Sequence, residues 1–374
     1  MIKEDYSIKI LGVDSRMNKK IVHYNMDKID SIGANYNLIW GERSNGKSYQ
    51  VKHKKGVVKY LETGRRFILM RRYKEEITSE KIASYFNDVD VKKLTDGRYN
   101  CIDMYRKVLY LANYDIETGK TTRGEKIGYV VALSTEQNYA GGSYLDVDDI
   151  IFEEFMSRST YIPRESSKLL NFYCTVDRKR GTTRLWMVGN TISRVCPYIN
   201  DWDLQRIIST QKQGTIITKD MDGEDGEKIT IAIEYCKSTG VSSNTFGKQA
   251  KMLNDGSWQT DIQPHLPKSY NEYDVLLRVI FLFKGFKFIG ELLNDGTTQP
   301  WYIYPYDGEI DNNTIVISDE VRPSKLWSRD IYHVGIDNIA LQKYLSTFRE
   351  SNIFYATDLI GTDFKQAIDF SINK

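Results

Sequence analysis

The sequence is poor in the residues that build disulfide frameworks and metal clusters. It has four cysteines, with no C-x-x-C pair among them, and four scattered histidines. We therefore expect neither a disulfide scaffold nor a cysteine- or histidine-based metal site. It also lacks any apolar run near the roughly 18 residues of a membrane span, and its start lacks the regions of a signal peptide. These absences predict a soluble, cytoplasmic protein with no membrane partner.

The composition is that of an ordinary globular protein, with 41% hydrophobic and 27% charged residues among 374. A chain of this length can hold two or three compact units. The net charge of +2 excludes little, but eleven lysines and arginines stand against two acids between Gly41 and Lys74. Such an excess can bind a phosphate backbone or can be a solvated helix face. The charge count leaves both interpretations open.

One segment, Gly41-Glu42-Arg43-Ser44-Asn45-Gly46-Lys47-Ser48, matches the phosphate-binding loop pattern G-x-x-x-x-G-K-[ST] at every fixed position. Its glycines let main-chain N–H groups turn toward a triphosphate, while Lys47 supplies a cation and Ser48 a hydroxyl for Mg²⁺. An apolar strand at 35–40 precedes it, and a helix from 47 to 62 follows, ending at Gly64. The helix N-terminus adds its dipole to the anion site. The segment therefore predicts a nucleotide site.

A second acidic signal stands about a hundred residues downstream, where the apolar strand 147–152 ends in Glu153 and Glu154. One such acid can hold Mg²⁺, and the next can orient and activate the attacking water. We assign Glu153 to the metal and Glu154 to the water. On its own, an acidic pair at a strand end is more often a solvated turn, but the phosphate loop favours the catalytic role.

Two further polar positions follow the acidic pair. Arg178 closes a predicted helix that begins at Glu165, where it is either a cation on the helix dipole or an arginine finger offered to a neighbouring subunit. Asn190 ends the strand 184–191, where it either senses the γ-phosphate or caps the next turn.

The rest of the chain alternates between strands and helices and predicts an α/β protein. We expect a P-loop domain at 1–240 that includes an N-terminal extension to residue 34, a short helical linker at 241–270 and a small α+β domain at 271–374. In the first domain we expect strands at 66–72, 99–112 and 128–134, a helix at 78–88, a polar loop at 115–126 and a hairpin at 213–219 and 228–236. In the last domain we expect a hairpin at 275–293 about Lys284-Gly285, strands at 301–304 and 314–318, and helices at 338–348 and 363–370.

The sequence resembles the DNA-packaging motor ATPases of small, short-tailed, protein-primed double-stranded DNA phages, which are relatives of the large terminase subunit. The order of the shared blocks is kept across residues 36–200. The resemblance rests on the segments 41–48, 69–74, 84–89, 150–155, 161–163, 169–171, 175–178 and 189–191.

The resemblance implies an additional-strand ATPase that uses ATP and Mg²⁺ and forms a ring, expected to be a pentamer, on the portal of an empty capsid. It would lie in the host cytoplasm, transiently at the portal vertex, and pump double-stranded DNA inward. It assigns Glu154 as the catalytic glutamate, Arg178 as the finger acting in trans, and Arg43 as a cis arginine. The part at 271–374 would be a vestigial, ribonuclease-H-like domain that attaches to the portal assembly, in some members through a structural RNA, without cutting DNA. Glu153 replaces the family's aspartate, and its extra methylene is expected to lengthen the metal contact.

Two kinds of alternative share the phosphate loop: a GTPase or small-molecule kinase, and a nucleotide-binding adaptor. A GTPase needs an N-K-x-D element, which is absent, and a small-molecule kinase would not need the acidic pair. A nucleotide-binding adaptor that does not hydrolyse ATP is the other alternative.

Overall fold

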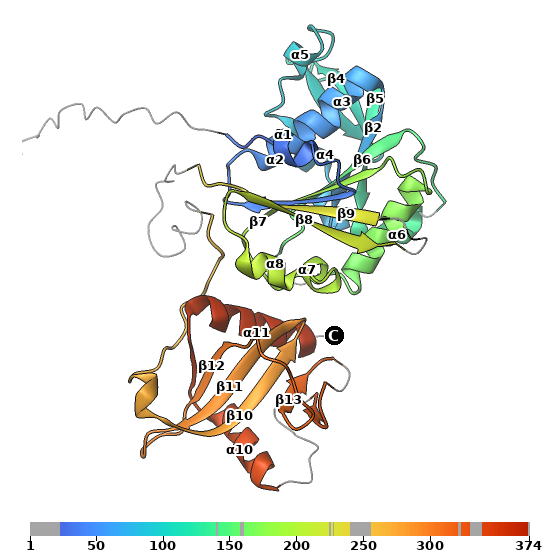
Figure 1. Cartoon of the computed structure of the whole chain (residues 1–374). Helices are drawn as coiled ribbons and strands as arrows, with labels where there is room; N and C mark the ends of the chain where they lie inside the picture. Colours follow the sequence, from blue (N-terminus) through green and yellow to red (C-terminus); the bar gives the residue numbers. More distant parts are fainter. Residues whose placement is uncertain are drawn as a thin grey trace, which may run out of the picture.

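The computed structural model describes residues 23–139, 141–157, 161–223, 226, 228–239, 256–320, 323–329 and 339–372. Figure 1 shows two lobes, a larger one built on a long twisted sheet and a smaller C-terminal one below it. Within the described ranges, no helix is both long enough and apolar enough to cross a membrane.

The larger lobe is organised by a nine-stranded sheet in the order β3-β4-β5-β2-β6-β7-β1-β9-β8. Six central strands are parallel: β5 (Thr121–Ala132), β2 (Arg66–Arg71), β6 (Val147–Glu153), β7 (Arg184–Asn190), β1 (Tyr36–Gly41) and β9 (Lys228–Tyr235). Antiparallel strands extend the edges: β3 (Cys101–Tyr105), β4 (Val108–Tyr114) and β8 (Thr215–Asp222). β7 lies between β1, which leads into the phosphate loop, and β6, which ends in the acidic pair. The predicted additional-strand fold requires a strand at this position.

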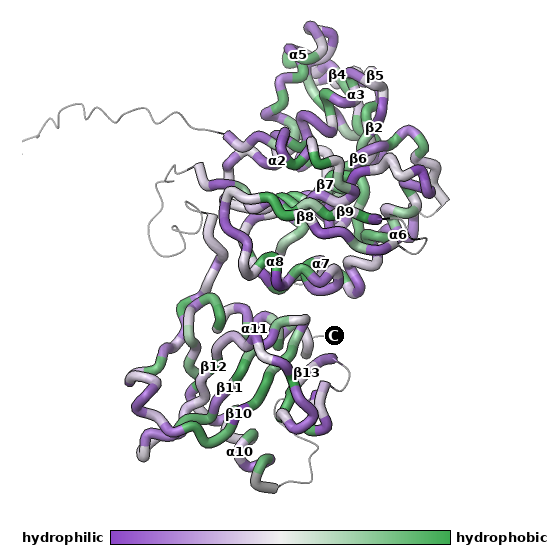
Figure 2. The backbone as a smooth tube through the Cα atoms, in the orientation of Figure 1, coloured by the Kyte–Doolittle hydropathy of each residue, from purple (hydrophilic) through white to green (hydrophobic). Residues whose placement is uncertain are grey.

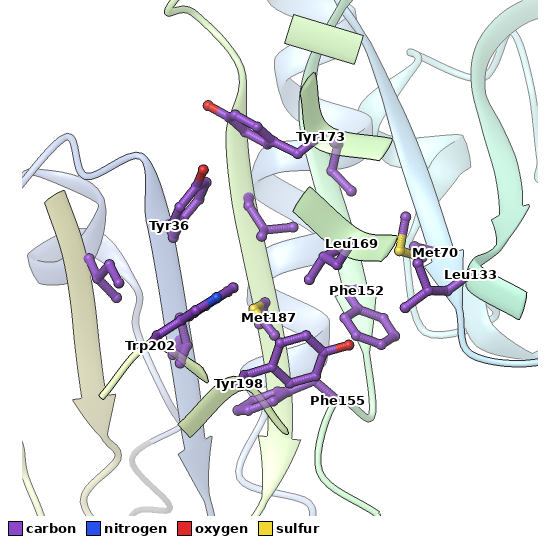
Figure 3. Packing of buried hydrophobic residues seen from close by; sticks show 14 of the residues in the cluster. Tyr36, Met70, Leu133, Phe152, Phe155, Leu169, Tyr173, Met187, Tyr198 and Trp202 are labelled. Atoms are coloured by element: carbon purple, nitrogen blue, oxygen red, sulfur yellow. The ribbon is translucent and has the colours of Figure 1, made fainter. Parts of the chain in front are cut away.

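Helices cover both faces of this sheet. One face carries α1 (Asp27–Asp30), the helical run after the phosphate loop, α4 (Ser79–Phe86) and α5 (Val91–Leu94). The other carries α6 (Glu165–Asp177), α7 (Pro197–Asp201) and α8 (Gln205–Thr210). Figure 3 shows this second core, where Phe152 and Met187 of the strands meet Leu169 of α6 and Tyr198 of α7. The two layers explain why the central strands are almost continuously apolar, which Figure 2 shows as green tube.

The predicted helix at 47–62 exists, but its middle is wound more widely. It runs as α2 (Lys47–Val51), the π-helix η1 (Lys52–Val58) and α3 (Lys59–Thr63), and it ends at Gly64, whose φ of 71° lies in the left-handed region. Within η1, Gly56 lies against the ring of Phe67, where an added Cβ would stand only 3.2 Å away. π-Turns of this kind occur often beside functional sites.

The polar segment 115–126 was predicted as a loop, and that prediction was wrong over its second half. The segment β5 begins at Thr121 and pairs with Tyr114 of β4, so only 115–120 turns. The turn is held by Asp115, whose carboxylate accepts hydrogen bonds from the backbone of Glu117 and Thr118. Cross-strand pairing satisfies the backbone groups even though the side chains are polar. The short helices η2 (Lys74–Glu76) and η3 (Leu133–Tyr139) complete this lobe.

The C-terminal lobe contains a six-stranded mixed sheet with two helices on one face. Its order is β14 (Leu326–Ser328), β13 (Ile315–Ser318), β10 (Asp274–Phe283), β11 (Phe286–Asn294), β12 (Trp301–Pro305) and β15 (Ile353–Tyr355). The helices are α10 (Ile339–Glu350) and α11 (Asp358–Ile372), and one turn of 3-10 helix, η4 (Tyr270–Glu272), precedes the sheet. The predicted hairpin about Lys284-Gly285 is confirmed, and both residues have the positive φ that a tight turn demands. The strands β14 and β15 were missed because each has three residues.

The two lobes are tied together by the chain between them and by side chains. Residues 256–269 contain no helix or strand, and the segment 242–254, predicted to be helical, lies outside the described residues. The backbone of Gln259 bonds to the larger lobe at Thr191, and that of Asp261 bonds to Thr362 in α11. Arg194 also donates to Asp363 at 2.9 Å, with both side chains buried.

Candidate nucleotide site

The predicted site residues of one subunit meet at the carboxyl edge of the parallel strands. The phosphate loop follows β1, the acidic pair ends β6, and Asn190 ends β7. Because these strands are parallel, their carboxyl ends lie at the same edge. A pocket of about 760 Å³ is lined by residues 43–50 of the loop and its helix, together with Glu154, Asn190 and Asp88. The loop residues, Glu154 and Asn190 thus lie together, as the sequence analysis expected of a nucleotide site, while their roles stay predictions.

The conformation of the phosphate loop depends on a residue with a left-handed backbone and on hydrogen bonds from its lysine. Gly46 has φ 96° where the loop enters α2, a conformation that favours glycine. Lys47 Nζ donates to the carbonyl of Glu42 at 2.5 Å and to Asn190 Oδ1 at 3.0 Å. Burial lowers the pKa of Lys47 to about 8, so its ammonium still predominates at neutral pH. Arg43 and Ser44 lie exposed at the pocket wall.

Glu42, inside the loop, holds the loop to the end of the larger lobe. Its carboxylate is buried and accepts hydrogen bonds from the hydroxyl of Ser238 at 2.7 Å and the backbone of Thr239 at 2.6 Å. The phosphate loop is thus held by the residues that follow β9 as well as by β1. Nothing in the pattern G-x-x-x-x-G-K-[ST] marks this position.

The two residues predicted to bind metal touch each other. Ser48 Oγ donates to Glu153 Oε2 at 2.9 Å, and the other carboxylate oxygen accepts from the Tyr85 hydroxyl at 2.7 Å. Glu153 is 4% exposed, and burial raises the pKa of its carboxyl. A hydroxyl and a carboxylate are the oxygen donors that Mg²⁺ prefers, so the residues present fit a metal-bound nucleotide.

The side chain of Glu154 points in a different direction from that of Glu153. Its φ is 58°, which turns its side chain out of the sheet and toward the pocket. The carboxylate accepts from Arg71 Nη2 at 3.2 Å, while Arg71 Nε donates to Glu76 at 2.9 Å. Glu154 is therefore exposed enough to meet water, yet it is held by a cation from the neighbouring strand.

Arg72 fixes the backbone on which Glu154 stands. Arg72 is 5% exposed. Its guanidinium donates to the carbonyls of Glu154 and Phe155 at 3.0 and 2.6 Å, and to both carboxylate oxygens of Glu165 at 3.0 Å. Glu165 also accepts from the hydroxyl of Tyr198 at 2.7 Å. This network joins β2, the turn after β6 and α6.

We expect Arg72→Ala to destabilise the protein by ~3–5 kcal/mol, since it leaves the buried Glu165 carboxylate without its cation. Arg98→Ala is the matched control, because the Arg98–Glu125 pair lies at the surface, where an ion pair contributes under ~1 kcal/mol. Urea unfolding of both variants, followed by tryptophan fluorescence, measures the difference. Equal destabilisation of the two would contradict a structural role for Arg72.

Arg178 lies away from the pocket of its own subunit. It caps the end of α6, and its Nη2 donates to the carbonyl of Gly142, shortly before β6 begins. The pocket stands beyond the other end of β6, roughly 20 Å away along seven residues. Within the described chain, Arg178 and the phosphate loop therefore lie near opposite ends of the parallel strands.

Three residues that contact the acidic pair were given no role in the sequence analysis. Arg71 and Arg72 end a buried strand next to the acidic strand, a placement that could have marked them, but the sequence analysis counted them in the basic run and in the segment 69–74 without giving either a role in the site. Tyr85 lies on α4, and no spacing signal connects it to Glu153.

Eight of the eleven basic residues at 41–74 form ion pairs within the chain. This favours an internal role for these basic residues over an open phosphate-binding face.

The chain is similar to known proteins of phage DNA packaging. The family model described as podovirus DNA encapsidation protein (Gp16) matches residues 17–214. The DNA packaging protein of Bacillus phage phi29 is 33% identical over 187 residues, which is 48% of this chain and 49% of that protein. The DNA packaging protein of Bacillus phage B103 is 35% identical over 170 residues, 43% of this chain and 46% of that one. The chain spans about half the length of the curated relatives it matches.

A solved structure of the bacteriophage Phi-29 viral genome packaging motor assembly has the same fold. It aligns with a TM-score of 0.56 at 21% identity, over 93% of this chain and 99% of that one. The alignment includes the C-terminal lobe as well as the larger lobe.

Proposed function

The chain belongs to the podovirus DNA encapsidation protein (Gp16) family, and from that premise we propose that it is an ATP-hydrolysing ring motor that moves double-stranded viral DNA into an empty capsid through the portal. The observation that carries the proposal is one pocket lined by Lys47, Ser48, Glu154 and Asn190, with Glu153 hydrogen-bonded to Ser48. The relatives named DNA packaging proteins support the substrate. A kinase or a passive adaptor is not favoured, because neither needs this full set.

In the proposed mechanism, the loop binds the triphosphate through the backbone of 43–48 and through Lys47. Ser48 and Glu153 would hold Mg²⁺, and the chemistry that the metal would supply is neutralisation of phosphate charge. Lys47 must then exchange its bond to the Glu42 carbonyl for phosphate oxygens, while Asn190 stays close enough to contact the γ-phosphate. Arg43 adds a second cation at the pocket wall.

Glu154 is proposed to orient the attacking water and to accept its proton. Its turned backbone presents the carboxylate to the pocket, and Arg71 limits the directions in which it can point. Arg178 is proposed to reach the phosphate of a neighbouring subunit, since it lies near the end of the parallel strands opposite to the phosphate loop of its own subunit. The active site would then be completed only between subunits of a ring, for which we propose a pentamer.

The motor is proposed to work in the host cytoplasm and to dock transiently at the portal vertex of the procapsid. We propose the division into a P-loop domain at 1–240, a linker at 241–270 and a C-terminal domain at 271–374, with the last attaching to the portal assembly, either directly or through a structural RNA. ATPase rates measured with and without double-stranded DNA test the proposal, together with DNase protection in the presence of procapsids. Turnover that ignores DNA, with no protected DNA, would favour the adaptor or kinase instead.

We further infer that the C-terminal lobe is ribonuclease-H-like and does not cut DNA. In the described residues, no three His, Cys, Asp or Glu side chains gather as a metal cluster. Two acids of its sheet are each paired with a cation: Glu291 with Arg278 at 2.7 Å, and Asp319 with Lys284 at 2.8 Å. Such pairing opposes the binding of a metal pair.

We therefore expect the full-length protein to leave supercoiled plasmid intact in Mn²⁺ or Mg²⁺ over hours, as judged by agarose gels. A Glu291→Gln, Asp319→Asn double variant serves as the control for contaminating nuclease. Cleavage by the wild type that this variant loses would show an active nuclease and overturn the inference.

A further inference from the structure

We propose that Tyr85 is the positioning residue that aims the Glu153 carboxylate at the nucleotide-bound Mg²⁺. This inference rests on the proposed function, which makes Glu153 a metal ligand. Tyr85 lies on α4, on the opposite side of the carboxylate from Ser48, and its hydroxyl donates to Oε1 at 2.7 Å while Ser48 donates to Oε2 at 2.9 Å. One oxygen is thus held by the loop and the other by a separate helix.

The need for such a brace follows from the length of the side chain. Glutamate has one more rotatable bond than aspartate, so a free Glu153 carboxylate would sample more directions than the metal site can use. It is also buried, at 4% exposure, and a buried carboxylate oxygen without a donor is costly. The Tyr85 hydroxyl satisfies that oxygen and selects one orientation. Partners of a metal ligand commonly set its aim in this way.

Tyr85 is itself held from the phosphate-loop helix. Lys52, in the π-turn, is 4% exposed, donates to the backbone carbonyl of Tyr85 and pairs with Asp88 at the end of α4. Its ammonium also lies 4.3 Å from the centre of the Tyr85 ring. Lys47, which is proposed to contact phosphate, belongs to the same helical run as Lys52. That run therefore supports both Lys47 and, through Lys52, Tyr85.

The test removes only the hydroxyl. Tyr85→Phe keeps the ring, its edge contact with Phe86 at 4.9 Å and the ring's packing on Lys52. Tyr60→Phe is the matched control, because the Tyr60 hydroxyl also donates to a glutamate, Glu125, at 3.2 Å but far from the pocket. Binding of a fluorescent ADP analogue is titrated with Mg²⁺ and, separately, measured in EDTA.

We expect Tyr85→Phe to raise the Mg²⁺ concentration for half-maximal enhancement of binding about tenfold, with the EDTA affinity unchanged. The melting temperature should fall, because a buried carboxylate oxygen of Glu153 loses its donor. Tyr60→Phe should leave all three unchanged. In the Glu153→Asp background, where the shorter carboxylate cannot reach the hydroxyl, Tyr85→Phe should have no further effect.

Two outcomes would overturn the proposal. The first is an unchanged Mg²⁺ titration for Tyr85→Phe while Glu153→Gln abolishes the Mg²⁺ effect, which would leave the proposed function standing. The second is an equal loss of affinity in EDTA and in Mg²⁺, which would make Tyr85 merely structural. If Glu153→Gln itself leaves the Mg²⁺ effect intact, the metal assignment in the proposed function fails first, and the proposal about Tyr85 fails with it.

Discussion

Mixing Arg178→Ala protein with Glu154→Gln protein should restore ATPase activity that neither variant has alone. Each variant by itself lacks one half of every active site. Removal of an arginine finger lowers hydrolysis by about 10³ to 10⁵-fold, because the developing charge on the γ-phosphoryl loses its cation. In a mixed ring, an Arg178→Ala subunit keeps Glu154, and a Glu154→Gln neighbour can supply Arg178 across the interface.

The expected size of the rescue follows from random assembly. In an equal mixture, about one interface in four combines an intact glutamate with an intact finger, so activity should approach a quarter of the wild-type rate if interfaces act independently. Lys179→Ala is the control, since it removes the adjacent cation of the same turn. Steady-state phosphate release is measured with DNA present and at several mixing ratios. No rescue at any ratio would exclude Arg178 as a finger in trans.

This prediction depends on topology that the sequence conveyed only in part. The patterns at 35–40, 147–152 and 184–191 predicted the three strands that carry the site, because buried parallel strands are long apolar runs between turn signals. The helix ending near Arg178 was also expected. That Arg178 lies far from the loop follows from the parallel pairing of β6 and β7. The helix α6 between them has to return toward the start of both strands, so its end lies there.

The side-chain network of the site could not be derived in the same way. Tyr85 meets Glu153 through a packing between α4 and the sheet, and the two residues are 68 positions apart. Arg72 and Glu165 are separated by 93 positions. Contacts at such distances depend on how helices settle onto the sheet, and neither periodicity nor a short motif encodes that. For the same reason, three-residue strands such as β15 gave no pattern to find.

The second large effect concerns Glu154 itself. We expect Glu154→Gln to bind ATP with nearly wild-type affinity and to hydrolyse it about 10² to 10⁴-fold more slowly, the range for loss of a general base. Affinity should persist because the loop, Lys47 and Glu153 are unaffected. The glutamine can still accept a hydrogen bond from Arg71 through its amide oxygen, so the turn at φ 58° is preserved while proton acceptance is lost.

Glu76→Gln is the control that separates chemistry from charge. Glu76 is the other partner of Arg71, at 2.9 Å, so its replacement also removes one negative charge from the same guanidinium. It does not face the pocket lined by Glu154. If Glu154 accepts the proton, Glu76→Gln should retain most turnover, measured by single-turnover hydrolysis of radiolabelled ATP. Comparable losses in the two variants would instead mean that Arg71 needs both carboxylates, and that Glu154 acts by fixing that arginine.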